Sequence, residues 1–128
     1  MSPRVHHVAL WVLDIERMRT FYVTHLGGRS GPLYHNPRTE LRSYFITFDN
    51  GCAIELMQGP NAGASPVGRT AGYTHIALSL GGRDAVDAAV DVLRQSGIKV
   101  QSGPRTTGDG YYEAVILDPE GNDIELTA

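Results

Sequence analysis

The sequence of 128 residues contains only one cysteine, Cys52, and no long apolar run. One cysteine cannot form a disulfide within the chain, so the fold must be stabilised by a hydrophobic core. The longest unbroken apolar run covers six residues, 8–13, which is far too short to span a bilayer. The N-terminal stretch has no apolar segment typical of a signal peptide. We therefore expect a cytoplasmic protein that does not cross a membrane.

The chain also lacks an excess of basic residues. It has 11 Lys and Arg against 14 Asp and Glu, a formal net charge of −3. Nucleic-acid-binding domains and proteins that bind anionic membranes need a basic surface, so this balance argues against both. The length is sufficient for one domain with its own core. We expect a partner of another kind, a small-molecule substrate.

The strongest pattern in the sequence is an internal repeat. HHVALWV and CAIELMQ in the first half correspond to THIALSL and NDIELTA in the second. His75 follows His7 by 68 positions, and Glu125 follows Glu55 by 70. Two independent pairs with nearly the same spacing indicate that one structural unit occurs twice.

Each half is predicted to form a strand, a helix and three further strands. In the first half the helix begins after the N-cap Asp14 and ends at Gly27-Gly28. In the second, Val86, Val90 and Leu93 form the buried stripe of a helix that ends at Gly97. Expected strands cover 5–13, 29–34, 43–48 and 52–58, then 73–80, 98–101, 111–117 and 123–127. Residues 59–72, rich in Gly, Pro and Ala, are predicted to link half-modules 1–58 and 73–128 within one α+β domain, 1–128.

Alternation along the strands gives each of four strands an aliphatic face and an opposite face with one ionisable residue. These four residues are His7, Glu55, His75 and Glu125. A carboxylate between Ile and Leu in a strand is costly to bury unless it has a partner. A single His or Glu of this kind is more often structural or solvent-facing. Four at matching repeat positions indicate a shared polar cavity, and two imidazoles with two carboxylates suit a divalent Ni, Zn, Co, Mn or Fe ion.

Four other residues are candidates for binding a substrate. Arg38 and Arg42 could hold an anionic group, although solvent-exposed surface is the default interpretation for both. Tyr111 follows the flexible stretch TTGDG and could close over a site, with core packing as the alternative. Trp11 lies on the same predicted strand face as His7 and could stack on a planar ligand.

HHVALWV, the FY of the first helix, AIELMQ, THIALSL and DPEGNDIEL resemble the vicinal oxygen chelate superfamily over essentially the whole chain. This superfamily includes glyoxalase I, methylmalonyl-CoA epimerase, extradiol dioxygenases and fosfomycin- and bleomycin-resistance proteins. The resemblance implies two paired βαβββ modules that form a curved mixed sheet around a metal-binding cavity. It also implies a homodimer, with the site formed within one chain or across two.

Glyoxalase I is the member that the ligand set resembles most. The resemblance implies that His7, Glu55, His75 and Glu125 bind the metal, that Glu125 is the catalytic base and that Glu55 is a ligand or second base. The implied reaction moves a proton through a metal-bound enediolate of a hydroxy-carbonyl or hemithioacetal. Trp11 departs from the bacterial enzymes, which usually have an arginine here that holds the glutathione carboxylate.

Two other functions remain open at the level of sequence. The first is a bleomycin-resistance-type protein that binds a planar ligand between Trp11 and tyrosines without catalysis. The second is an Fe(II) dioxygenase, in which Glu55 would not be a ligand. Ligand binding that persists in the presence of a chelator would support the first function. Oxygen consumption by the iron-loaded protein would support the second.

Overall fold

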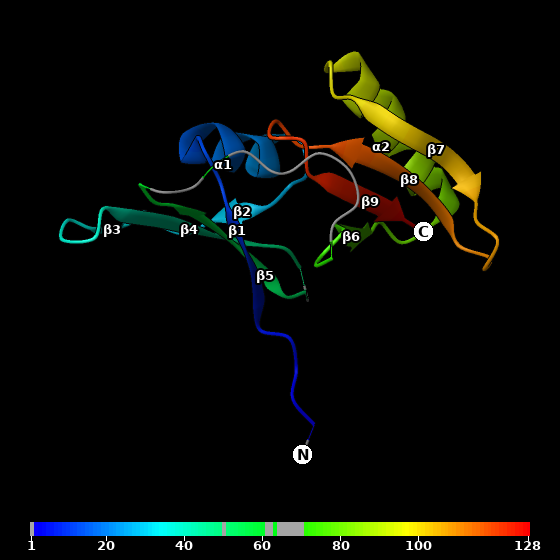
Figure 1. Ribbon diagram of the computed structural model, residues 1–128. Coiled ribbons are helices and arrows are strands. Elements are labelled where there is room, and N and C mark those ends of the chain that lie inside the picture. The colour runs from blue at the N-terminus through cyan, green and yellow to red at the C-terminus, as the bar shows by residue number, and fades with distance from the viewer. Residues whose placement is uncertain (1, 50, 61–62, 64–70) are drawn as a thin grey trace. The chain divides into compact units, whose positions relative to one another are not determined.

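The computed structural model describes residues 2–49, 51–60, 63 and 71–128. The chain divides into two compact units, Met1–Ser65 and Pro66–Ala128 (Figure 1). The predicted linker 59–72 lies largely outside the described residues. In the part of the chain that the structure describes, no helix is both long enough and apolar enough to cross a membrane.

The first unit is a mixed sheet with one helix. Its elements in chain order are β1 (His7–Trp11), α1 (Ile15–Thr24), β2 (Arg29–Ser30), β3 (Tyr34–Asn36), β4 (Leu41–Thr47) and β5 (Ala53–Gln58). The strand order is β1-β5-β4-β2, and β3 also pairs with β4. β1 and β5 are parallel, and the other pairs are antiparallel. Asp14 is the N-cap of α1, as predicted, and its carboxylate accepts a hydrogen bond from the Arg17 amide at 3.1 Å.

The expected strand over 29–34 is divided into the two short strands β2 and β3. Gly31 and Pro32 lie between them. Proline has no amide hydrogen for a strand ladder, and glycine weakens a strand interior, so the pairing is interrupted here. The Gly31 amide still donates to the Phe45 carbonyl at 2.9 Å, which keeps the break beside β4.

The second unit repeats the arrangement. Its elements are β6 (His75–Ser79), α2 (Arg83–Gln95), β7 (Val100–Thr106), β8 (Tyr112–Leu117) and β9 (Asp123–Thr127). The strand order is β6-β9-β8-β7, and β6 and β9 are parallel. β7 extends beyond residue 101, where the predicted strand 98–101 ends. Register shifts between Val100 and Ser102 and between Ser102 and Arg105 accommodate Gly103 and Pro104 within the strand.

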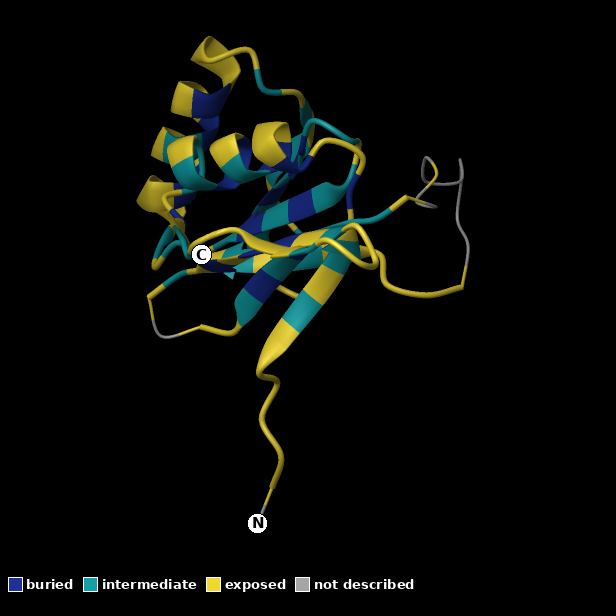
Figure 2. Ribbon diagram, turned by 90° about the vertical axis from the view of Figure 1, so that its left-hand side faces the viewer, coloured by how far each residue is buried: buried dark blue, intermediate teal, exposed yellow. Residues whose placement is uncertain are grey.

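Each unit has its own core between its helix and one face of its sheet. Buried and less buried residues alternate along the central strands in Figure 2, as expected for a sheet covered on one face. The core of the first unit consists of Val12, Ile15, Met18, Phe21, Tyr22, Tyr44, Ile46, Ile54 and Leu56. That of the second consists of Val86, Val90, Leu93, Ala114, Ile116, Ile124 and Leu126. Two mixed sheets, each with a helix, make an α+β fold and confirm that prediction.

Candidate metal centre

One His–Glu pair lies on the helix-free face of each sheet. The first pair is His7 with Glu55, and the second is His75 with Glu125. In both units the glutamate is paired with the alanine two residues after the histidine, so both side chains project from the same face. The imidazole Nε2 lies 3.6 Å from a carboxylate oxygen in the first pair and 3.2 Å in the second. The predicted correspondence between the halves therefore holds in three dimensions, unit by unit.

Burial is also matched in the two pairs. The histidine side chains are 38% and 41% exposed, and the glutamates are 16% and 17% exposed. Each glutamate stands between two buried aliphatic residues that point toward the helix, Ile and Leu in both strands. The aliphatic neighbours anchor the strand, and the polar side chains are left on the open face.

Each histidine has its second ring nitrogen next to a polar neighbour. In the first pair, His7 Nδ1 lies 2.9 Å from His6 Nδ1. In the second pair, His75 Nδ1 lies 2.9 Å from the Thr74 hydroxyl. A polar partner on one ring nitrogen fixes the orientation of the imidazole and leaves the other nitrogen available for a ligand. Nε2 is thus the atom that each histidine can offer beside its glutamate.

The donor types fit a divalent transition metal. Neutral imidazole nitrogens and carboxylate oxygens are ligands for Zn, Ni, Co, Mn and Fe. Among the described residues, no group of three or more His, Cys, Asp and Glu is arranged to hold a metal ion. Each unit by itself therefore supplies two donors, one nitrogen and one carboxylate.

The surroundings of the two pairs differ. In the first unit, Phe45 is paired with Glu55, and its ring meets the His7 ring edge-on at 5.3 Å between centroids. In the second unit, Val115 occupies the corresponding position opposite Glu125. There Glu113 on β8 lies near the pair. The main cause that raises the pKa of Glu113 is a hydrogen bond with the Glu125 carboxyl, and burial adds to the rise.

Sequence reasoning did not single out Glu113. The repeat that identified the two pairs gives no signal for it, because the corresponding residue of the first unit is Ser43. The available signal was alternation along β8, which places Glu113 and Val115 on one face. That face is opposite to Ala114, which is buried.

Trp11, one of the predicted substrate-binding residues, lies on the face of the first His–Glu pair. Trp11 follows His7 by four residues on β1, the residue is 64% exposed, and its ring packs close to Gly59. Tyr111 precedes Tyr112, whose hydroxyl donates to Asp87 on α2. Tyr111 itself lies just before the start of β8 and is 60% exposed, so strand alternation does not assign its side chain to a face.

The two predicted arginines lie elsewhere in the first unit. Arg42 is paired with Gln58, whose amide oxygen accepts a hydrogen bond from the Ile15 amide at the start of α1. Arg42 is therefore on the helix side of the sheet, opposite to Glu55. It lines a cavity of about 340 Å³ with His35, Glu40, Gln58, Gly59 and Pro60. Arg38 lies in the turn between β3 and β4, where its amide donates to Asn36.

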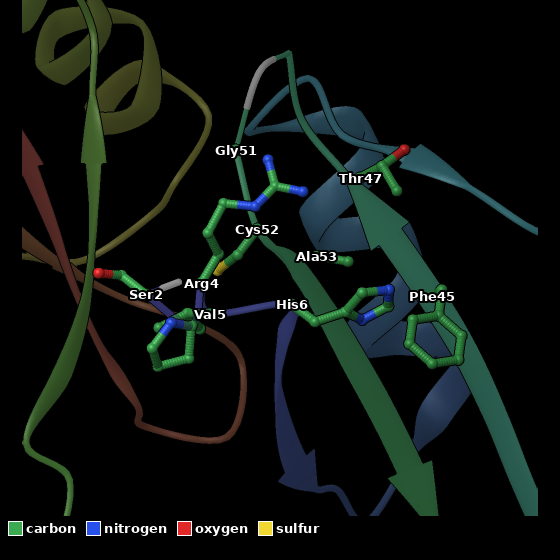
Figure 3. Close-up of a pocket in the computed structure, with 10 residues that line it drawn as sticks. Ser2, Arg4, Val5, His6, Phe45, Thr47, Gly51, Cys52 and Ala53 are labelled. Atoms are coloured by element: carbon green, nitrogen blue, oxygen red, sulfur yellow. The ribbon is translucent and has the colours of Figure 1, made fainter.

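A larger cavity of about 810 Å³ lies beside the first pair, at the start of β1. Figure 3 shows the Arg4 side chain extending toward Gly51 and the His6 ring near Phe45. The lining residues are Ser2, Pro3, Arg4, Val5, His6, Phe45, Thr47, Gly51, Cys52 and Ala53. Through Phe45 this cavity adjoins His7.

Comparisons with known proteins identify the family. Residues 4–126 match the Glyoxalase/Bleomycin resistance protein/Dioxygenase superfamily. The chain is 30% identical over 126 residues to a lactoylglutathione lyase of Haemophilus influenzae, covering 96% of this chain and 90% of that one. It is 26% identical over 121 residues to a mitochondrial methylmalonyl-CoA epimerase of Bos taurus, covering 91% and 67%.

Solved structures agree on the fold. The protein SMU.1112c matches with a TM-score of 0.83 and 26% identity over 98% of both chains. The trypanothione-dependent glyoxalase I of Leishmania major matches with a TM-score of 0.79 and 22% identity, covering 98% of this chain and 86% of that one. With a family match along nearly its whole length, the chain belongs to the Glyoxalase/Bleomycin resistance protein/Dioxygenase superfamily.

Proposed function

We propose that this protein is a metal-dependent lyase or isomerase of the glyoxalase type that acts on a small hydroxy-carbonyl or hemithioacetal substrate. The observation that carries the proposal is the repeated His–Glu pair, with Nε2 facing a carboxylate oxygen at 3.6 Å in one unit and 3.2 Å in the other. Relatives named lactoylglutathione lyase at 30% identity support the reaction type.

The proposed metal ligands are His7, Glu55, His75 and Glu125. Each unit supplies one imidazole and one carboxylate, so a four-ligand site draws on both units, from one chain or from two chains of a homodimer. A divalent ion would polarise the substrate oxygens and stabilise the negative charge that develops when a carbon-bound proton leaves.

In this proposal Glu125 moves the proton. Its carboxylate removes the proton from the hydroxyl-bearing carbon and returns it to the adjacent carbonyl carbon, while the hydroxyl proton passes to the former carbonyl oxygen, so the substrate is isomerised with no net change in protons. The flanking Ile124 and Leu126 are 1% exposed and fix the strand that carries this carboxylate. Glu55, in the corresponding position of the first unit, binds the metal or acts as a second base.

The experiment compares Glu125→Gln with its repeat-matched control Glu55→Gln. The substrates are the hemithioacetals of methylglyoxal with glutathione and with 2-mercaptoethanol, and the protein is loaded with Ni²⁺ or Zn²⁺. General base catalysis contributes about 10²–10⁴-fold, so we expect kcat of the Glu125 variant to fall by that factor and that of Glu55→Gln to fall less. Full activity of Glu125→Gln in folded protein would exclude this role.

A second function, binding of a planar ligand without catalysis, is favoured by one observation. Trp11 is 64% exposed on the face that carries His7. A ligand held by stacking on this ring would quench its fluorescence and remain bound in the presence of EDTA. Release of the ligand by EDTA would instead favour the metal-dependent function.

A further inference from the structure

The exposed aromatic residues of the first unit gather on one face of its sheet. Among the described residues of this unit they are Trp11, Tyr34 and Phe45, which are 64%, 52% and 38% exposed. Phe45 on β4 is paired with Glu55 on β5, so both side chains project from the helix-free face. Apolar side chains that are exposed together mark a binding surface, whereas single exposed ones are ordinary.

Two of these aromatic residues stand at the ends of one row across four strands. Trp11 on β1 is paired with Met57 on β5. Met57 is paired with Ser43 on β4, which in turn is paired with Tyr34 on β3. Because Met57 follows Glu55 by two residues, the row shares the face of Glu55 and lies about 7 Å further along the strands. Ser43 is 4% exposed, so the exposed surface of this aromatic row comes from its three larger side chains.

The repeat gives the aromatic row a counterpart in the second unit, two residues beyond Glu125 on β9. Its members also project from the helix-free face, but all four are polar. In the order of the aromatic row they are Ser79, Thr127, Glu113 and Arg105. The second unit thus forms the same sheet around the same His–Glu pair without an aromatic residue in this row. The fold alone therefore does not account for Trp11 and Tyr34.

We propose that the aromatic row binds an aromatic or other planar apolar group of the substrate. This inference rests on the proposed function, since a substrate whose reacting carbons lie beside Glu55 has its next substituent about 7 Å away, over Met57. Trp11 and Tyr34 offer rigid rings on which a planar group can stack. The substrate class is then a hydroxy-carbonyl compound that carries such a group next to its two oxygens, and Trp11 and Tyr34 determine the specificity.

The kinetic test compares two hemithioacetals of 2-mercaptoethanol, one formed with phenylglyoxal and one with methylglyoxal, in protein loaded with Ni²⁺ or Zn²⁺. The ratio of their kcat/KM values measures the preference for phenyl over methyl, and the intrinsic reactivity of each substrate is the same for every variant. An apolar contact the size of one methylene group changes such a ratio about 10–200-fold. We therefore expect the ratio to fall at least about tenfold in Trp11→Ala and in Tyr34→Ala.

Tyr73→Ala is the matched control, because it removes an aromatic residue of the second unit that is 99% exposed and lies outside both rows. This variant should keep the wild-type ratio. A ratio that stays at the wild-type value in Trp11→Ala and Tyr34→Ala, or that falls equally in Tyr73→Ala, would overturn the inference.

A second measurement needs neither metal nor turnover. Trp11 is the only tryptophan in the sequence, so tryptophan emission reports directly on the aromatic row. In metal-free protein we expect 1-phenyl-1,2-ethanediol to change this emission and 1,2-propanediol, with methyl in place of phenyl, to leave it unchanged. The Kd of the phenyl compound should rise about tenfold in Tyr34→Ala. No response of the folded wild type, or an unchanged Kd in Tyr34→Ala, would overturn the inference.

The two proposals fail in different ways. A protein that binds the phenyl compound at Trp11 but converts neither hemithioacetal would contradict the proposed function and support the aromatic row as a binding site. The competing occupant of the row is a second copy of this chain. A wild-type dimer that Trp11→Ala converts to monomers in size-exclusion chromatography would identify the row as an interface between copies and overturn the inference.

Discussion

Among the described glycines of the second unit, Gly103 is the one where an added methyl group would be most crowded by its neighbours. It adopts φ of +80°, in the region that side chains disfavour, and a Cβ there would lie 2.6 Å from the Glu113 carbonyl oxygen and 3.0 Å from the Ala114 Cα. Both neighbours are backbone atoms of β8, so neither can rotate away. Gly103→Ala should therefore destabilise the unit that carries Glu113 and Glu125.

Gly97 allows the size of this effect to be divided into two parts. It has φ of +81° and no atom within 4 Å of a Cβ position, so Gly97→Ala is subject to the conformational cost alone. That cost is about 1–2 kcal/mol for a residue in the left-handed region. Gly103→Ala adds the steric overlap with β8, which resembles overpacking at about 1–3 kcal/mol. We expect a total of about 2–5 kcal/mol for Gly103→Ala.

Urea unfolding followed by far-ultraviolet circular dichroism measures the free energy of unfolding of both variants and the wild type. The difference between Gly103→Ala and Gly97→Ala isolates the overlap because both glycines have nearly the same φ. Equal losses in the two variants would refute the argument, since they would mean that β8 yields to the methyl group at no cost.

Three further outcomes follow from the structure. The Tyr44 hydroxyl donates a hydrogen bond to Glu16 at 2.7 Å, and this bond is the main cause that raises the pKa of Tyr44. Because Tyr44→Phe removes the bond, we expect the unfolding free energy of this variant to be about 1–2 kcal/mol lower than that of the wild type. Because the pKa of Tyr44 is raised in the folded state, this contribution is complete below about pH 10 and is lost as pH rises through the folded pKa. A difference in unfolding free energy between wild type and variant that stays constant up to high pH would contradict this. Leu126→Ala, at a position 1% exposed, should cost about 2–5 kcal/mol in urea unfolding, and a loss below 1 kcal/mol would contradict the burial. Metal at about 100 times its Kd should raise the unfolding free energy by about 2.7 kcal/mol, measured as a higher urea midpoint that EDTA reverses.

The repeated pattern of histidine and glutamate was predictable from sequence because strand alternation is a strict geometric rule. His7 and Glu55 project from one face once β1 and β5 are neighbours, and the same holds for His75 and Glu125. The helix positions were predictable for a similar reason, since apolar spacing and the Asp14 N-cap are local signals.

Features that depend on register were not predictable. Arg42 lies on the helix side because it shares a strand face with the buried Tyr44 and Ile46, and β4 pairs with β5 in the register that places Arg42 opposite Gln58. Glu113 escaped detection because repeat symmetry finds only what both halves share, and the first half has Ser43 there. The division of 29–34 into β2 and β3 reflects a missing amide hydrogen at Pro32, whose effect depends on the neighbouring strand.

The central claim, a metal held by the two His–Glu pairs, is tested most directly by elemental analysis of untagged, chelator-free wild-type protein and of His75→Ala. We expect about one transition-metal ion per chain in the wild type, or after addition of Ni²⁺, Co²⁺, Zn²⁺ or Fe²⁺, and its loss in the variant. A wild-type protein that takes up none of these ions, or a variant that retains the wild-type content, would contradict the claim.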